Sequence, residues 1–280
     1  MKTRILAAFV GVPLLLLSIF FLPVWIFAIL IGGVTAVIAW ELCSATKVAP
    51  NARARTYALI FAAAIPILAG LYDLIPNHGL LFYSPISPIL LLALLLAGEL
   101  VLCYGTKKAL KLSDFLVLLL AGGIIPTFFS HLVLLNLTFG HQYYLLLPFL
   151  IAFVSDAGAY FTGGIFGKEK LIERVSPNKT RAGAVGGLIL CTVGVAAFAV
   201  TAHLVDGAGL NIPAIFLYGI VGSVIVQLGD LVFSAIKREY HVKDFGTLIP
   251  GHGGMLDRFD SMILLAPFVS IMLGYFPLFG

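Results

Sequence analysis

The sequence predicts an all-α polytopic membrane protein with about nine transmembrane helices, and three observations predict that class. Hydrophobic residues fill 61% of the 280 positions and charged residues only 11%, whereas soluble domains carry about 25% charged residues. The mean hydropathy is +1.09. Apolar runs of about 20 residues, enough for one helical crossing, alternate with short segments rich in charge, glycine or proline. This composition excludes an ordinary soluble domain.

The apolar runs set the positions of the expected helices. Each run is bounded by charged or turn-forming residues, and Pro23 separates the first run from the second. We expect helices at residues 4–22, 24–46, 54–74, 86–104, 113–138, 143–164, 182–204, 211–236 and 257–279. Because the loops between them are short, we expect any functional site to be built from helix ends and loops.

The positive charges orient the chain in the membrane. If all the expected helices cross, each of the 17 Lys and Arg residues falls on the same side. The opposite loops carry Asp73, His78, His141 and Asp206 instead. Because Lys and Arg mark the cytoplasmic side of a membrane, we expect a cytoplasmic N-terminus and a C-terminus outside.

Acidic residues inside the expected helices indicate a polar cavity. An acid within a membrane helix is costly and usually marks a functional cavity. Asp156 and Asp230 lie deepest in their helices, on the cytoplasmic half, and we assign them to a cavity open to the cytoplasm. Glu41, Glu99 and Asp114 lie nearer helix ends, where capping or snorkelling explains them.

The segment from residue 234 to residue 261 concentrates charge and glycine between two apolar runs. A helix leading into it places Asp230, Ser234, Lys237 and Arg238 along one face, because their offsets are 0, 4, 7 and 8. That face combines a carboxylate, a hydroxyl and two cations. Such a combination is typical of a site for an anionic ligand.

A glycine-rich turn follows in the same segment. Gly251, Gly253 and Gly254 free the backbone to approach a ligand and to present N–H groups to anionic oxygens. Asp257 and Asp260 come three residues apart at the start of the last helix, so they face one side and can share a divalent cation. Carboxylates, glycine N–H groups, Lys and Arg together are the usual equipment for phosphate esters handled through Mg²⁺.

A second cluster of polar residues lies between the helices expected at 143–164 and 182–204. It contains Lys168, Ser176, Lys179 and Thr180. The Gly167-Lys168 pair does not complete a phosphate loop of the Walker type, because Glu169 follows where Ser or Thr is required. Two interpretations stay open: a positively charged loop with helix-packing glycines, or a second wall of a phosphate-binding site.

The motifs resemble those of the phosphatidate cytidylyltransferases, also called CDP-diacylglycerol synthases. The family signature S-x-x-K-R-x-x-x-x-K-D-x-x-x-x-I-P-G-H-G-G-x-x-D-R-x-D is matched from Ser234 to Asp260. The patterns D-x-x-A-Y-x-x-G and S-P-x-K-T are matched from Asp156 to Gly163 and from Ser176 to Thr180. One departure is Arg181-Ala182-Gly183, where many members carry an acidic residue. The resemblance covers roughly the C-terminal half of the chain.

This resemblance implies a reaction in which phosphatidate attacks the α-phosphorus of CTP, giving CDP-diacylglycerol and pyrophosphate. It implies Mg²⁺ as the cofactor, with a second metal ion as a further candidate, and a homodimer. Residues 1–140 would be the N-terminal transmembrane helices and residues 141–280 the transmembrane catalytic region of one integral membrane unit. The implied location is the inner membrane of a prokaryote, with the active site facing the cytoplasm and no nucleic-acid partner.

The resemblance also assigns roles to residues. Asp230 and Asp257 would bind the metal ion, with Asp260, Asp156 and Asp244 as further candidate ligands. The expected catalytic residues are Asp230, Asp257, Lys237, Arg238 and His252, although His252 is equally suited to a structural role in the turn. The expected substrate-binding residues are Lys168, Ser176, Lys179, Thr180, Ser234, Lys243, Gly251, Gly253, Gly254 and Arg258.

Other classes remain as alternatives. A related CTP-using membrane enzyme, such as a polyprenol kinase or a CDP-archaeol synthase, would keep the headgroup chemistry and change the lipid tail. A transporter would need polar residues on both sides of the midplane, and the outer half of this chain is nearly uncharged. Cys43, Cys103 and Cys191 have unrelated spacings, so we expect neither a disulfide framework nor a zinc site.

Overall fold

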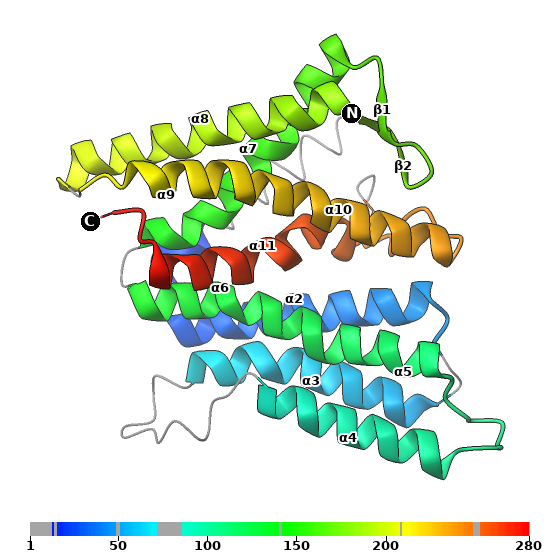
Figure 1. Cartoon of the computed structure of the whole chain (residues 1–280). Helices are drawn as coiled ribbons and strands as arrows, with labels where there is room; N and C mark the ends of the chain where they lie inside the picture. The colour runs from blue at the N-terminus through cyan, green and yellow to red at the C-terminus, as the bar shows by residue number, and fades with distance from the viewer. Residues whose placement is uncertain are drawn as a thin grey trace. The chain divides into compact units, whose positions relative to one another are not determined.

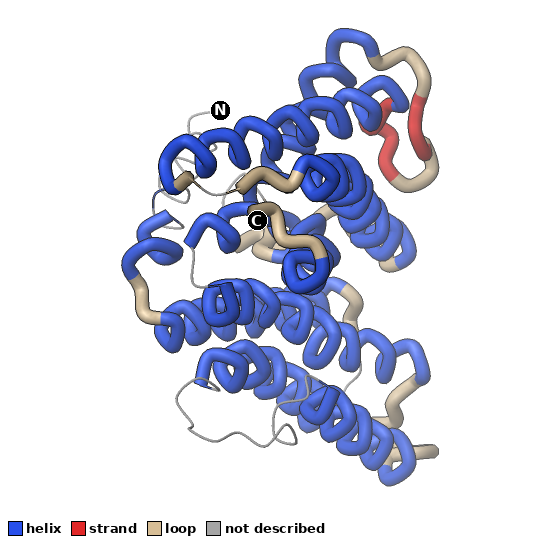
Figure 2. Tube along the Cα trace, turned by 60° about the vertical axis from the view of Figure 1, so that its left-hand side comes forward, coloured by secondary structure: helices blue, strands red, loops and turns tan. Residues whose placement is uncertain are grey.

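The computed structural model describes residues 13, 16–48, 51–71, 86–139, 142–207, 209–248 and 253–279. Within these residues the chain is almost entirely helical, with one short pair of strands (Figure 2). Helices long and apolar enough to cross a membrane are found at 24–45, 52–71, 112–137, 144–166, 181–205 and 212–239, and a shorter apolar helix at 87–102. The all-α membrane class is therefore confirmed. The count of nine and the orientation stay predictions, and most of the expected first helix lies outside the described residues.

The chain divides into two compact units. The first unit contains Met1–Gly140 and Val242–Phe259, and the second contains His141–His241 and Asp260–Gly280. The second boundary falls inside the last helix, whose first turn belongs to the first unit. Each unit is described by itself below.

The helices of the first unit follow the expected apolar runs to within a few residues. They are α2 (Val24–Ala45), α3 (Ala52–Leu71), α4 (Ile86–Leu102), α5 (Leu112–Leu119) and α6 (Ile125–Phe139) (Figure 1). Helices α2 and α3 pack closely, and the Thr35 hydroxyl donates across the pair to the Ala62 carbonyl at 2.6 Å. A π-helical segment, Leu120–Ile124, joins α5 to α6 without a break.

The second unit has the same kind of long helix, together with a strand hairpin and a π-helical segment that the sequence did not predict. Its elements are α7 (Gln142–Phe166), β1 (Lys170–Ile172), β2 (Ser176–Thr180), α8 (Arg181–Asp206), α9 (Ile212–Phe216), a π-helical segment (Leu217–Val221), α10 (Gly222–Glu239) and α11 (Leu256–Tyr275). The strands form an antiparallel hairpin that pairs Lys170 with Thr180. An exposed ion pair between Glu169 and Arg181, 2.9 Å long, closes the base of this hairpin.

Both π-helical segments lie where a glycine meets a neighbouring helix backbone. A Cβ added at Gly122 would lie 2.6 Å from the Ala58 Cα of α3, and one at Gly219 would lie 2.5 Å from the Thr192 Cα of α8. No larger side chain fits at either position without a shift of the helices. The π turns therefore sit at close contacts between helix backbones, and such bulges are a known cause of helix bending.

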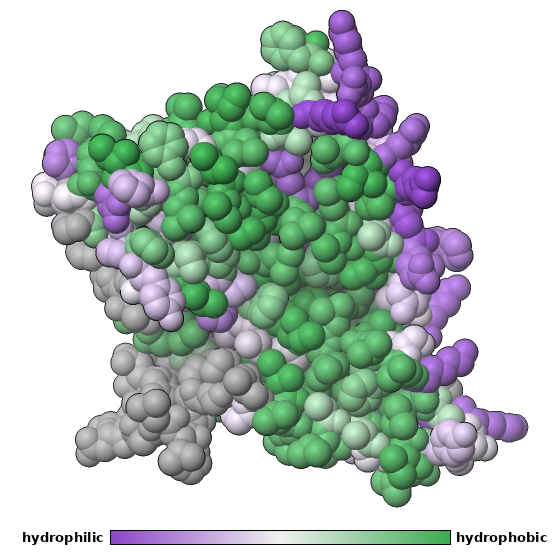
Figure 3. All heavy atoms as spheres, in the orientation of Figure 1, coloured by the Kyte–Doolittle hydropathy of each residue, from purple (hydrophilic) through white to green (hydrophobic). Residues whose placement is uncertain are grey.

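The helix surfaces suit a lipid environment. In Figure 3 hydrophobic side chains cover the sides of the helices, and hydrophilic side chains gather towards helix ends. In the most apolar stretch of α8, only 22% of the residues are buried within the protein. A helix that is apolar on its exposed faces is typical of a membrane span, so the uncovered faces of α8 are available to lipid.

Candidate active site

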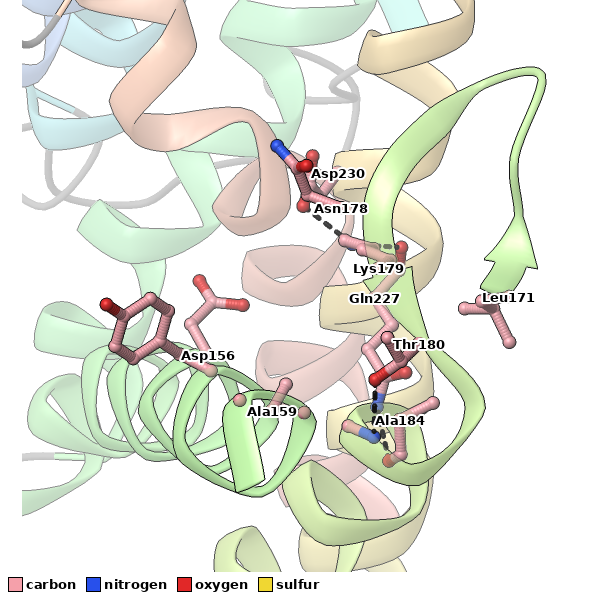
Figure 4. Close-up of a pocket in the computed structure, with 13 residues that line it drawn as sticks. Asp156, Ala159, Leu171, Asn178, Lys179, Thr180, Ala184, Gln227 and Asp230 are labelled. Atoms are coloured by element: carbon pink, nitrogen blue, oxygen red, sulfur yellow. Dashed lines mark hydrogen bonds and ion pairs between the residues drawn. The ribbon is translucent and has the colours of Figure 1, made fainter. Parts of the chain in front are cut away.

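A pocket of about 610 Å³ lies within the second unit, between α7, α8, α10 and strand β2 (Figure 4). Its polar side chains include Asp156, Lys179, Gln227 and Asp230. Small residues complete much of its wall: Ala159, Gly163, Gly164, Gly183 and Ala184. The pocket thus brings together Asp156 of α7, Lys179 of the second polar cluster and Asp230, which shares a helix face with Ser234, Lys237 and Arg238.

An ion pair joins two of these groups. Lys179 Nζ lies 2.6 Å from Asp230 Oδ2, and the Ser234 hydroxyl donates to Asp230 Oδ1 at 3.1 Å. Lys179 also donates to the Gln227 carbonyl at 3.4 Å. Its position is fixed by the next residue, because Thr180 caps α8 by accepting from the Gly183 amide. Strand β2 of the hairpin therefore holds Lys179 in the wall of the pocket.

Three carboxylates of the second unit, those of Asp156, Asp230 and Asp260, interact electrostatically. Asp156 projects from α7 into the pocket, and Lys179 and Asp230 lie on the opposite side of the pocket (Figure 4). Among the described residues Asp156 has neither a hydrogen bond nor an ion pair. The negative charge of Asp230 acts on both Asp156 and Asp260. Asp260 is buried, and Lys237 Nζ lies 3.9 Å from its Oδ2. Such a group of acids favours a bound cation.

Gln227 is a pocket residue that the sequence did not single out. Its amide nitrogen donates to the Ala184 carbonyl at 3.1 Å and to Ser223 Oγ at 3.2 Å. Ser223 is in turn hydrogen bonded to Ser155 at 2.7 Å. A carbonyl can only accept, so the amide nitrogen of Gln227 must face Ala184. The signal for Gln227 was its position one turn before Asp230 on the same helix face.

The glycine-rich turn belongs to the first unit, where two carboxylates hold its backbone. Asp257 Oδ2 accepts from the Phe245 amide at 2.8 Å and from the Gly254 amide at 3.0 Å. Glu41 of α2 accepts from the next two amides, Met255 and Leu256, at 2.9 and 2.8 Å. The Gly254 N–H, which we expected to face a substrate, therefore bonds to the protein itself.

Of the remaining expected site residues that the structure describes, none lines the pocket. Arg238 donates from Nε to the Val175 carbonyl of the hairpin turn at 3.3 Å, and its side chain is exposed. Lys168, Lys243, Asp244 and Arg258 are exposed, and Ser176 begins strand β2. Gly251 and His252 lie outside the described residues.

The donor set fits a divalent cation that is shared with a ligand. Within the part of the chain that the structure describes, no three His, Cys, Asp or Glu side chains form a metal-binding group. Mg²⁺ usually takes only one or two carboxylates and completes its shell with water and substrate phosphates. Asp156 and Asp230 match that requirement, whereas zinc-like cages need three or four protein ligands.

Among the described residues, six helices are long and apolar enough to cross a membrane, which is typical of an integral membrane protein. Its pocket combines carboxylates with a lysine, a set of side chains that can accept an anionic ligand together with a cation. The chain belongs to the cytidylyltransferase family, whose sequence model matches residues 2–276. This match places the pocket and the glycine-rich turn, together with both units, inside one family region.

Named relatives agree with the family. The chain is 47% identical over 131 residues to the phosphatidate cytidylyltransferase of Staphylococcus haemolyticus, and 44% identical over 135 residues to that of Bacillus subtilis. In these two comparisons the chain spans about half of the relative, 49% and 48% of its length. The phosphatidate cytidylyltransferase of Haemophilus influenzae is 32% identical over an alignment of 283 positions, gaps included, that covers 96% of this chain and 97% of the relative.

Proposed function

We propose that this protein transfers the CMP moiety of CTP to phosphatidate and releases pyrophosphate. The observation that carries the proposal is the meeting of two family motifs in one pocket. Asp156 and Lys179 come from the two motifs before α8, and both line the pocket with Asp230 of α10. Ser234, the first residue of the third motif, donates to Asp230. The relative in Haemophilus influenzae, similar over nearly its whole length, is named for this activity.

The reaction needs one bond to form and one to break. An oxygen of the phosphatidate phosphate attacks the α-phosphorus of CTP, and the bond from that phosphorus to the bridging oxygen of the β-phosphate breaks. Negative charge grows on the departing pyrophosphate. Positioning and charge stabilisation supply most of the catalysis in such a transfer, so cations near the phosphates are the main requirement.

The residues of the second unit supply those groups. Lys179 and Lys237 carry the positive charges, while Ser234 and Lys179 orient the carboxylate of Asp230. We propose that Asp156 and Asp230 hold Mg²⁺, with Asp260 beside them. The ion, when bound, would screen the phosphate oxygens and offset the charge of the leaving group. Asp257 is proposed as a ligand from its place in the signature.

We also propose how the protein lies in its membrane. The distribution of Lys and Arg supports nine crossings, an N-terminus in the cytoplasm and a C-terminus outside. The active site would then face the cytoplasm from the inner membrane, where CTP is present and a lipid phosphate lies at the interface. A homodimer is proposed from the family resemblance alone.

One assay tests the activity. Purified protein in detergent receives labelled CTP, Mg²⁺ and either phosphatidate, a polyprenol or an archaeal ether lipid, and labelled lipid and pyrophosphate are both measured. We expect equal amounts of the two products with phosphatidate. Labelling of the polyprenol or the archaeal lipid, without labelling of phosphatidate, would reject the proposal in favour of a related lipid substrate.

A further inference from the structure

Glu41 is a buried acid on α2 whose role none of the sequence motifs explains. Its side chain is 1% exposed, and its two oxygens accept from consecutive backbone amides, those of Met255 and Leu256. These amides belong to the start of α11, where a helix leaves its first N–H groups without partners. Glu41 therefore caps a helix that begins more than 200 residues later in the chain.

The turn is shaped around this carboxylate. A Cβ added at Gly254 would lie 2.5 Å from Glu41 Oε2, and one at Gly246 would also meet the Glu41 carboxylate. Both glycines are thus needed for the approach of Glu41. A helix is normally capped by a nearby Ser, Thr, Asn or Asp, but here Gly254 and Met255 occupy those positions. The cap comes from another helix instead.

Glu41 and Asp257 divide the amides of the turn between them. The Gly254 amide bonds to Asp257 Oδ2, and the next two amides bond to Glu41. Asp257 Oδ2 also accepts from Phe245, which ties residues 245 and 254 to one carboxylate oxygen. The orientation of Asp257 therefore depends on a backbone that Glu41 holds in place.

We propose that Glu41 is the positioning residue of the glycine-rich turn. It fixes the start of α11 and, through the backbone there, the orientation of the Asp257 carboxylate. This inference rests on the proposed function, since it assumes that Asp257 serves the metal ion. Residues that orient metal ligands change metal affinity by about 10–100-fold when they are mutated. Glu41 is given that function, although it touches neither substrate nor metal.

The same contacts allow one competing role. A helix N-terminus with consecutive free N–H groups binds phosphate, so Glu41 could instead occupy a place that a substrate phosphate takes over. The two roles predict opposite results. Loss of the Glu41 charge weakens a positioned site, whereas it opens a blocked one and tightens the binding of pyrophosphate.

The test compares Glu41→Gln with a matched control, Glu99→Gln. Glutamine keeps the shape of Glu41 but places an NH₂ group opposite one backbone N–H, so one amide of the turn loses its acceptor. Glu99 is a second buried acid of the same unit, 5% exposed, bonded to Asn51 at 2.8 Å and to Arg53 at 3.3 Å. Its partners Asn51, Arg53 and Cys103 all lie outside the turn.

Three measurements are made on each purified full-length variant. They are Mn²⁺ binding without substrate, followed by electron paramagnetic resonance; amide hydrogen exchange in peptides that cover residues 253–258; and steady-state kinetics with CTP, phosphatidate and Mg²⁺. For Glu41→Gln we expect metal binding weakened by about 10-fold or more, faster exchange in the turn, and a lower kcat with little change in the KM for phosphatidate. Glu99→Gln should resemble the wild type in all three.

The outcomes separate this proposal from the proposed function. Wild-type metal affinity and exchange in Glu41→Gln would overturn the positioning role even if the enzyme is active. Pyrophosphate is also added as an inhibitor in the kinetic assay, and tighter inhibition of Glu41→Gln than of the wild type would overturn the role as well. If the wild type transfers nothing to phosphatidate but Glu41→Gln still loses metal binding and turn protection, the positioning role stands and the proposed reaction fails. Equal losses in Glu99→Gln would mean general destabilisation and would also overturn it.

Discussion

Lys179 Nζ lies 2.6 Å from Asp230 Oδ2, and this ion pair joins a strand to a membrane helix in the wall of the candidate pocket. If Asp230 binds Mg²⁺ as proposed, the carboxylate has a metal ion as its partner and Lys179 is able to turn to a substrate phosphate. Both side chains are partly exposed, 22% and 30%, so neither is locked in place by burial.

The first prediction concerns that lysine. Lys179→Met removes the charge and keeps most of the side-chain volume, and we expect kcat to fall by about 100-fold or more, since one lost stabilising group costs that much in comparable transfers. Lys170→Met is the control, because Lys170 is an exposed lysine of the same hairpin. Steady-state kinetics with CTP and phosphatidate measure both. A loss of equal size in Lys170→Met would point to the hairpin fold rather than to the charge of Lys179.

The second prediction concerns Asp257. We expect Asp257→Asn to abolish turnover without unfolding the helices, because asparagine can still accept from a backbone amide but carries no charge for a metal ion. Asp114→Asn is a matched control, since Asp114 also accepts a backbone amide at a helix start, that of Lys111 at 3.1 Å. Turnover and the far-ultraviolet circular dichroism spectrum are compared. Near-normal activity of Asp257→Asn would contradict its assigned role as a metal ligand.

The helices were predictable from sequence because the signal that sets them is local. Runs of apolar residues ended by charge gave boundaries near those of α2, α3 and α7, which the structure confirms. The hairpin was not predicted, since Lys170–Ile172 is too short to show a strand pattern. The π turns were equally hidden, because Gly122 and Gly219 reveal their function only through the helix that each one contacts.

The candidate site divides in the same way. Asp156, Lys179 and Asp230 could be chosen in advance because an acid inside an apolar helix, or a lysine in a motif, is conspicuous in the sequence. Glu41 was interpreted as an interfacial or capping acid, and it does cap a helix, but the sequence did not show which one. Its partners, Met255 and Leu256, are remote in sequence, and no periodicity links them to α2. Long-range caps of this kind require the fold.

The third prediction tests the close approach in the turn. Gly254→Ala places a Cβ 2.5 Å from Glu41 Oε2, so we expect a lower thermal midpoint and a loss of most activity. Gly33→Ala on α2 is the control, because a Cβ there has nothing within 4 Å. Alanine favours a helix over glycine by up to about 1 kcal/mol, so the control should be as stable as the wild type or more so. Full activity of Gly254→Ala would contradict the tight contact between Glu41 and the turn.

The fourth prediction tests the proposed orientation with a thiol reagent that cannot cross membranes. The natural thiols suit the test, because Cys43, Cys103 and Cys191 are at most 6% exposed. We introduce one exposed cysteine at a time, as Lys108→Cys, Lys170→Cys or Leu210→Cys. In spheroplasts, whose outer membrane has been removed, only Leu210→Cys should react. Once the membrane is opened with detergent, all three should react. The positive-inside distribution of Lys and Arg requires this pattern, and labelling of Lys170→Cys in sealed spheroplasts would place the hairpin and its pocket on the outer side.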